Sequence, residues 1–417
     1  MSHAPPPPFR PLPIRAFNAL GRGASRLGVR GFSLAQSSLL AAARAEAKLD
    51  DLGSESFLPG LRVLLASLER EARLNAFGRY YARRQVLELL ICRLRLVDWR
   101  KRHAEVAEQQ ITRPLFVLGL PRTGTTLLYS LLALDPSHRS PLSWEIDDPC
   151  PPAEAASYGS DARIAKSEWR FSQLRELARG IQAIHPVGAA LPQECIVITA
   201  SEFASIRFEM CFDVPTYQDW LLEADMTGCY DWHKRFLQHL QSRFAKERWV
   251  LKSPGHLGTI DALLGAYPDA LIVQTHRDPR RVVPSVSSLE WTLRQVATDA
   301  LDPRALGKQQ LRAWSKTLRM GMRAREKRAA QASQFLDLHF HEIAADALGC
   351  VRRIYEHFGL SLTPEFELRM RDYVAAHPRE EHGAHRYTLA GFGLSAQEVD
   401  DAFADYVARF GVRREGA

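Results

Sequence analysis

An apolar stretch that runs into a glycine-containing turn and then into a second apolar stretch is the strongest constraint on how this chain folds. The segment LFVLGLPRTGTTLLYSLLALDP covers residues 115–136. Its first residues are typical of a buried strand, Gly119 and Gly124 bracket a turn, and a helix begins near Thr125. A buried strand that leads at once into a helix indicates a parallel sheet covered by helices.

The same strand-then-helix pattern returns three times, at residues 248–254, 270–279 and 334–343. We therefore predict an α/β fold over residues 111–417, with three α/β/α layers and a mainly parallel sheet. Residues 151–245 interrupt this pattern and are predicted as a helical insertion over the carboxyl ends of the strands, where open sheets bind ligands. Residues 36–110 are predicted as a helical N-terminal region, and residues 1–35 as a loose arm rich in Pro, Gly and Arg.

The composition is that of a globular protein, with 46% hydrophobic and 25% charged residues. The first residues lack the apolar run of a secretory signal, and no uninterrupted stretch of about 18 apolar residues occurs. The six cysteines show neither a Cys-x-x-Cys pair nor a Cys/His spacing typical of zinc. We expect a cytoplasmic protein with reduced thiols and no metal.

The net charge of +7 comes largely from arginines spread along the chain. It suits an anionic ligand, and we expect no nucleic-acid partner. The Arg-rich faces of residues 36–110 are typical of a solvated surface, with peripheral contact to a membrane or a partner as the alternative.

The turn between Gly119 and Gly124 has the glycine spacing of a phosphate-binding loop, as in the P-loop-containing nucleoside triphosphate hydrolases. Its backbone N–H groups and the positive end of the following helix favour an anion. Thr125 stands where a triphosphate loop has its lysine, and Arg122 is the nearest cation. The loop is better suited to a 5′-phosphate with one further anionic group than to a triphosphate with its metal. A plain strand-to-helix turn is the alternative.

A second anion site is indicated by THRDPRRVVPSVSSL at residues 275–289. Arg277 closes a predicted strand, and Ser285 lies eight residues later in the following helix. A guanidinium and a hydroxyl so placed can bind a second phosphate, the arginine with two parallel hydrogen bonds. The alternative is a salt bridge that only closes the strand.

Four motifs resemble one enzyme family. PRTGTT at residues 121–126, LKSP at 251–254, HRDPRRVVPSVSSL at 276–289 and HGAHRYTLAGFGL at 382–394 are similar to the bacterial branch of the sulfotransferases that use 3′-phosphoadenosine 5′-phosphosulfate. The resemblance covers roughly residues 113–410. It implies that residues 111–417 form a catalytic domain whose insertion at 151–245 covers the acceptor site, and that no metal is required.

The resemblance also implies roles for individual residues. It assigns the 5′-phosphosulfate to Arg122, Thr123, Gly124, Thr125 and Thr126. It assigns the 3′-phosphate to Arg277 and Ser285, and charge stabilisation at the transferring group to Lys252 and Arg122. The C-terminal loop of the family contacts the nucleotide, which implies Arg386 and Tyr387 as ligands, although Ala384 stands where relatives often have lysine.

Transfer of a sulfonyl group to an acceptor hydroxyl or amine needs a base. Glu145 is our first prediction, because the stretch from the loop to this residue resembles the tyrosylprotein sulfotransferases in spacing. His185 and Glu194 are the alternatives for the base, and Glu194 is also a candidate for shaping the acceptor pocket.

The acceptor is predicted only as a small molecule, a lipid or a sugar. Five aromatic residues of the insertion are candidates for an apolar acceptor pocket, with a place in the core as the alternative: Phe203, Phe208, Phe212, Tyr217 and Trp220. Two other functions compete with sulfonyl transfer. A small-molecule kinase would share the loop but would need a loop lysine and a metal-binding carboxylate, and a non-catalytic nucleotide-binding protein would not need polarising groups at the strand ends.

Overall fold

The computed structural model of the chain describes residues 10–28, 31–178, 181, 186–377 and 387–415. A five-stranded sheet with the order β2-β3-β1-β4-β5 forms its centre. The strands are β1 (Leu115–Gly119), β2 (His138–Arg139), β3 (Arg248–Lys252), β4 (Leu271–His276) and β5 (Phe335–His339). All four pairings are parallel, so the predicted parallel sheet is confirmed and every strand points its carboxyl end to the same edge.

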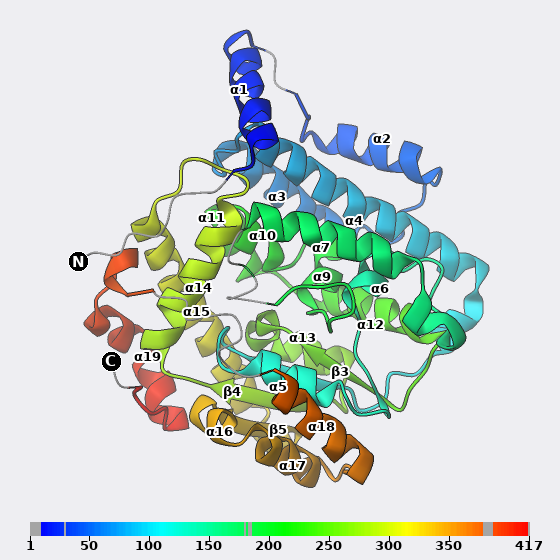
Figure 1. The fold of residues 1–417 in the computed structure, drawn as a ribbon, viewed down its shortest axis with the longest axis vertical. Coiled ribbons are helices and arrows are strands. Elements are labelled where there is room, and N and C mark those ends of the chain that lie inside the picture. The colour runs from blue at the N-terminus through cyan, green and yellow to red at the C-terminus, as the bar shows by residue number, and fades with distance from the viewer. Residues whose placement is uncertain (1–9, 29–30, 179–180, 182–185, 378–386, 416–417) are drawn as a thin grey trace.

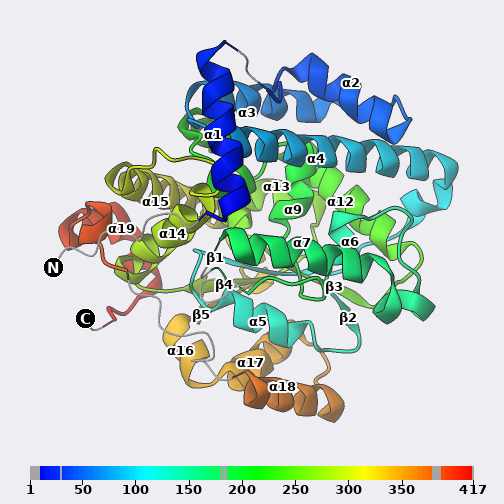
Figure 2. The same ribbon diagram turned by 45° about the horizontal axis from the view of Figure 1, so that its top comes forward.

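Alternate residues of β1 pack into two different cores, as expected for a strand buried on both faces. Phe116 and Leu118 face one layer of helices, whereas Leu115 and Val117 face the other. Helices of the first layer are α12 (Thr227–Gln241), α13 (Ile260–Ala266), α14 (Pro279–Arg294), α15 (Pro303–Lys327) and α19 (Ala396–Phe410). The second layer consists of α5 (Thr125–Leu132), α16 (Phe340–Ala345), α17 (Ala347–Phe358) and α18 (Pro364–Ala376). Figures 1 and 2 show the two layers on opposite sides of the sheet, which confirms the three-layer prediction.

Helices from the N-terminal region and from the insertion share a third core. The N-terminal helices are α1 (Leu12–Arg26), α2 (Gln36–Ala47), α3 (Leu58–Arg70) and α4 (Ala76–Arg102). From the insertion, α10 (Arg207–Cys211) and α11 (Pro215–Leu221) join this core. The insertion and the segment before it also contain α6 (Ser143–Asp147), α7 (Arg163–Leu177) and α9 (Ile196–Thr199), which pack in other clusters. In Figure 2 these helices lie above the sheet, with α1 to α4 outermost.

Part of the predicted loose arm is helical, because α1 lies within it. A proline in the first turn fits a helix start, since its missing N–H has no intrahelical partner there. Asn18 is buried, and its side-chain oxygen accepts a hydrogen bond of 2.8 Å from the Phe77 N–H at the start of α4. This contact ties α1 to the rest of the N-terminal region.

Among the residues that the structure describes, no helix combines the length and the apolarity needed to span a bilayer.

Candidate active site

The loop between β1 and α5 adopts backbone conformations that only a few residue types tolerate. Gly119 and Gly124 have positive φ angles of 147° and 88°, and Arg122 has φ of 68°. A Cβ atom on Gly119 would lie 2.4 Å from the Oγ1 atom of Thr275, so this position also needs glycine for close contact with β4. The positive φ angles turn the chain tightly from the end of β1 into α5, whose N-terminal N–H groups are free of intrahelical partners and so favour an anion.

The Thr123 side chain holds this loop together from inside. Its hydroxyl is fully buried, donates a hydrogen bond of 2.7 Å to the carbonyl of Leu120 and lies 2.5 Å from the Thr275 hydroxyl. Since the hydroxyl is used within the fold, Thr123 has only its backbone N–H to offer an anion. Thr126 is oriented differently: its hydroxyl accepts a hydrogen bond of 3.3 Å from Lys252 Nζ.

Arg122 meets Ser285 and Arg277, although more than 150 residues separate it from both in the sequence. Arg122 Nε donates to the Ser285 hydroxyl at 3.2 Å, and Arg277 Nη1 donates to the Arg122 carbonyl at 2.7 Å. Burial lowers the pKa of the Arg122 guanidinium, and the neighbouring charge of Arg277 lowers it further. Two guanidinium groups placed this close favour a ligand with more than one negative charge.

The Arg277 guanidinium already binds a carboxylate. Its Nε and Nη2 atoms contact the two Glu415 oxygens at 2.7 and 2.9 Å, in the paired geometry that arginine uses for oxyanions. Its Cζ atom also lies 3.6 Å from the centre of the Phe340 ring. This arginine is therefore held in position with its fork directed at an anion.

Glu194 and Lys252 form a nearly buried ion pair beside the loop. The Lys252 side chain, at the end of β3, is 5% exposed, and that of Glu194 is 10% exposed. The pair is linked to the loop by the hydrogen bond from Lys252 to Thr126. A carboxylate, an ammonium group and the anion-binding loop thus lie side by side at the sheet edge.

A cavity of about 800 Å³ opens from this point. One end is lined by polar groups that include Arg122, Thr126, Glu194, Lys252 and Arg277. Most of the remaining surface is apolar and comes from α4, α7, α10 and α14, although these helices also contribute charged side chains such as Arg84, Glu88 and Glu290. The apolar lining residues include Tyr81, Leu174, Leu177, Met210, Leu289 and Leu293. A molecule with one reactive end and an apolar body would fit this arrangement.

Glu145, our first prediction for the base, does not line this cavity. It lies on the short helix α6 and is fully buried. Its carboxylate forms an ion pair with Arg139 of β2 and accepts a hydrogen bond of 3.1 Å from Tyr158. Although these partners favour the charged form, burial dominates and raises the pKa of Glu145. The Glu145 carboxylate therefore lies in the core between Arg139 and Tyr158, and outside the lining of the cavity.

Two other predicted residues, His185 and Arg386, lie outside the described residues. Tyr387 is described, and its phenol acts electrostatically on Arg122, which places it near the loop. Gly124 and Thr125 line the cavity, as expected from the loop motif.

The five aromatic residues of the insertion lie in the core or pack against it, which is the alternative to the predicted acceptor pocket. Phe203, Phe208, Phe212 and Tyr217 are buried in the core shared with the N-terminal helices, and Trp220 packs against it. The sequence did not indicate that residues of α4 and α7 line the cavity. The apolar periodicity of these helices indicated helix, but it did not reveal which part of each helix faces a cavity.

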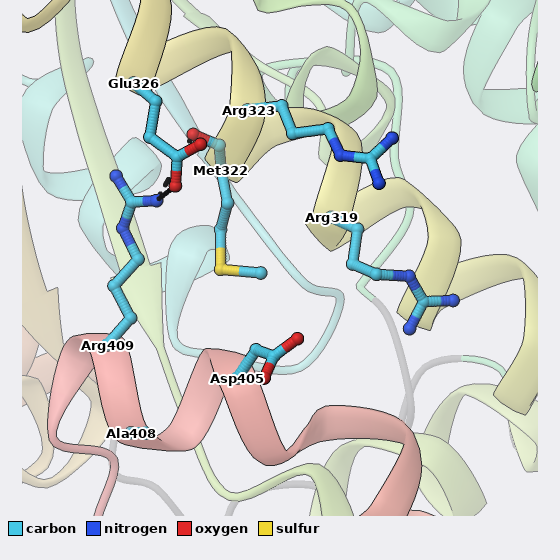
Figure 3. A pocket seen from close by; sticks show the side chains of 7 residues that line it. All are labelled: Arg319, Met322, Arg323, Glu326, Asp405, Ala408 and Arg409. Atoms are coloured by element: carbon cyan, nitrogen blue, oxygen red, sulfur yellow. Dashed lines mark hydrogen bonds and ion pairs between the residues drawn. The ribbon is translucent and has the colours of Figure 1, made fainter.

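A second hollow lies between α15 and α19 and is shown in Figure 3. Charged side chains dominate its lining, and Arg409 forms an ion pair with Glu326 there. None of the loop or strand-end residues discussed above lines it. We therefore place the functional site in the larger cavity.

The fold is a parallel sheet between two helical layers. Its first strand leads into a loop that has the glycine spacing of a phosphate-binding loop but no lysine, and cationic side chains lie at the strand ends. Known proteins with these features identify the class of enzyme. The profile of the sulfotransferase family matches residues 114–364, so the chain belongs to the sulfotransferase family and is a sulfotransferase. A curated relative is the omega-hydroxy-beta-dihydromenaquinone-9 sulfotransferase Stf3 of Mycobacterium bovis. It is 26% identical over 327 residues, which cover 74% of this chain and 78% of the relative.

Two solved structures resemble this one over nearly its whole length. Sulfotransferase STF9 from Mycobacterium avium has a TM-score of 0.85 and 30% identity, covering 93% of this chain and all of that chain. Sulfotransferase STF1 from Mycobacterium tuberculosis H37Rv has a TM-score of 0.79 and 32% identity, covering 90% of this chain and all of that chain. Both coverages are too large for residues 111–417 alone, so the similarity extends into the N-terminal helical region.

Proposed function

We propose that this enzyme transfers the sulfonyl group of 3′-phosphoadenosine 5′-phosphosulfate to the hydroxyl of an apolar small molecule, with Glu194 as the base. The observation that carries the proposal is the Glu194–Lys252 ion pair, which is linked to the loop through Thr126 and lines the same cavity as the apolar side chains of α7 and α14. A base must reach the acceptor, and a cation must reach the transferring group. This position meets both needs.

Two features of the chain support this donor. The loop lacks the lysine that is typical of nucleoside triphosphate loops, and Thr125 and Thr126 at the start of α5 line the cavity, where they and the loop N–H groups are proposed to bind the 5′-phosphate. Arg277 and Ser285 are proposed to hold the 3′-phosphate. The fit is supported by Glu415, whose carboxylate is bound by the Arg277 fork and so stands in for an oxyanion. Tyr387 and, by the family resemblance, Arg386 are proposed to close over the nucleotide.

The chemistry assigns a distinct task to each charged group. The bond from the sulfur to the acceptor oxygen forms as the bond from the sulfur to the 5′-phosphate oxygen breaks, and adenosine 3′,5′-bisphosphate leaves. Glu194 takes the proton from the acceptor hydroxyl, while Lys252 and Arg122 stabilise the charge that develops on the phosphate and sulfonyl oxygens. This reaction is balanced without an oxidant, a reductant or a metal.

The acceptor end of the cavity favours an apolar alcohol over a sugar. Leu, Met, Val and aromatic side chains supply most of its surface, although charged side chains such as Arg84, Glu88 and Glu290 also line the cavity. The relative from Mycobacterium bovis is named for a hydroxylated menaquinone. An acceptor of the same general kind, with a hydroxyl on an apolar body, would place its oxygen beside Glu194 and its body along α7 and α14.

Ligand-induced thermal stabilisation tests the donor. Adenosine 3′,5′-bisphosphate should stabilise the enzyme in the presence of a chelator, and AMP should stabilise it less, since it lacks the 3′-phosphate. Stabilisation by ATP with magnesium but not by the bisphosphate would contradict the proposal and favour a kinase. Stabilisation by the bisphosphate without turnover of any apolar alcohol would favour a non-catalytic binding protein.

A further inference from the structure

Three metal-binding side chains meet in the core directly behind the active site. They are Cys195 at the start of α9, His233 on α12, and His256 in the short 3-10 helix Pro254–Gly258 after β3. One ligand atom from each lies within 4.8 Å of the other two. Cys195 and His233 are fully buried, and His256 is 2% exposed.

Both imidazoles leave one nitrogen without a partner at this point. The Nε2 atoms of His233 and His256 are buried and make no hydrogen bond to any described residue. Buried polar atoms are nearly always paired, because an unpaired one loses its contact with water and gains nothing in return. Two such atoms beside one thiol indicate a missing common partner.

The opposite nitrogen of each ring is fixed by a tyrosine hydroxyl. His256 Nδ1 lies 2.6 Å from the Tyr230 hydroxyl, which lies 2.6 Å from Thr259 Oγ1, and Thr259 donates to the Gly255 carbonyl at 3.2 Å. The chain of donors ends on a carbonyl, so His256 Nδ1 carries the hydrogen and Nε2 keeps its lone pair. His233 Nδ1 is paired with the Tyr267 hydroxyl, at 2.8 Å. Metal-binding histidines characteristically have such an outer partner.

We propose that Cys195, His233 and His256 form a binding site for one transition-metal ion that prefers thiolate and imidazole ligands, zinc(II) or copper(I). Ligand atoms around a tetrahedral zinc ion lie about 3.3–3.6 Å apart, given the usual bond lengths. Small side-chain rotations would therefore bring the three atoms within bonding distance of an ion. The Cys195 thiol would lose its proton to solvent when the ion binds.

The position suggests what the ion would do. Cys195 directly follows Glu194, and its backbone N–H donates to the Lys252 carbonyl at 2.9 Å. His256 lies four residues after Lys252. An ion bound here would fix the Glu194 segment to the end of β3 without touching the substrate, so the three ligands would be positioning residues. Sequence spacing does not indicate this site, because the ligands are separated by 38 and 23 residues and match no metal motif.

Metal analysis of the purified enzyme tests this inference. Cultures supplemented with zinc, copper or cobalt should each be used, and the desalted protein measured by inductively coupled plasma mass spectrometry. We expect about one zinc or one copper ion per chain, which decides between the two ions. We expect less than about a tenth of that in Cys195→Ser. Cys229→Ser is the matched control, since Cys229 is a buried free thiol on α12 whose Sγ donates a hydrogen bond to the Ala204 carbonyl.

A spectroscopic measurement on the unmodified chain covers the case in which Cys195→Ser does not fold. Enzyme from cobalt-supplemented cultures should show a thiolate-to-cobalt charge-transfer band. The Cys229→Ser variant from the same cultures should show the same band. Enzyme that carries none of the three metals, shows no such band and keeps its melting temperature after treatment with a chelator would overturn the proposal. Metal that stays at full occupancy in a folded Cys195→Ser would also overturn it.

Discussion

Arg277 and Glu415 form a two-point ion pair, with both guanidinium contacts under 3 Å, at the site proposed for the 3′-phosphate. The side chains are 16% and 30% exposed, so solvent partly screens the pair. The Glu415 backbone N–H is in turn held by Asp278, 3.0 Å away. A ligand phosphate and the Glu415 carboxylate would therefore compete for one guanidinium.

Removing that carboxylate should strengthen nucleotide binding. A partly exposed ion pair contributes about 0.2–1 kcal/mol, so Glu415→Gln should lower the Kd for adenosine 3′,5′-bisphosphate up to about fivefold. Binding of AMP should change little, because AMP has no 3′-phosphate to take the vacated place. Isothermal titration calorimetry measures both. An equal effect on the two nucleotides would place the 3′-phosphate elsewhere.

The apolar end of the cavity should control the acceptor. Leu174 on α7 lines it, and Leu174→Trp would fill part of the space that an apolar acceptor needs. We expect KM for a long-chain alcohol to rise by about tenfold or more, while the Kd for adenosine 3′,5′-bisphosphate stays within about twofold. Leu174→Ala is the paired variant and should relax selectivity toward bulkier acceptors. A parallel loss of nucleotide binding in Leu174→Trp would mean that the cavity is not a separate acceptor site.

Glu145 should matter for stability and not for chemistry. Its ion pair with Arg139 is buried on both sides, and breaking such a pair costs about 3–5 kcal/mol because one charge stays buried alone. Glu145→Gln should lower the free energy of unfolding in urea by about 3 kcal/mol. Turnover per folded molecule, measured well below the melting temperature, should remain near that of the wild type. A stable variant without turnover would restore Glu145 as the base.

Stability should fall as the pH rises because of a carboxyl group in the insertion. Burial, reinforced by the charge of Glu290, raises the pKa of Glu209 to about 8. The folded state therefore binds this proton more tightly than the unfolded state, whose pKa is near 4.5. The resulting stabilisation is fully present below roughly pH 4.5 and is lost as the pH rises through about 8.

Glu209→Gln removes this titration. Urea unfolding at pH 5 and pH 8 should show a smaller decline for the variant than for the wild type, by an amount on the order of a few kcal/mol. Identical pH dependence of the two proteins would mean that Glu209 is solvated or paired.

The sequence predicted the features of this enzyme that depend on neighbouring residues. The strand, turn and helix at residues 115–132 follow from local apolar pattern and from glycines at two positions with positive φ. Arg277 and Ser285 were predicted to lie close together, because the first ends a strand and the second lies in the helix that directly follows it. The parallel sheet was predicted because an apolar strand followed by a helix occurs four times along the chain.

Tertiary contacts decided what the sequence could not predict. Glu145 follows the loop at the expected spacing, but α6 turns its side chain toward Arg139 on the edge strand β2. Glu194 stood only among the alternatives, and its partner Lys252 lies 58 residues further along the chain. Glu415 meets Arg277 across 138 residues, a separation at which charge pattern carries no information about contact.

Single-turnover kinetics of Glu194→Gln test whether Glu194 acts as the base. With 3′-phosphoadenosine 5′-phosphosulfate and an apolar alcohol, we predict a rate about 10²- to 10⁴-fold below that of the wild type. The Kd for adenosine 3′,5′-bisphosphate should stay within about threefold, which separates loss of the base from loss of the site. A Glu194→Gln variant that turns over at the wild-type rate would contradict the account.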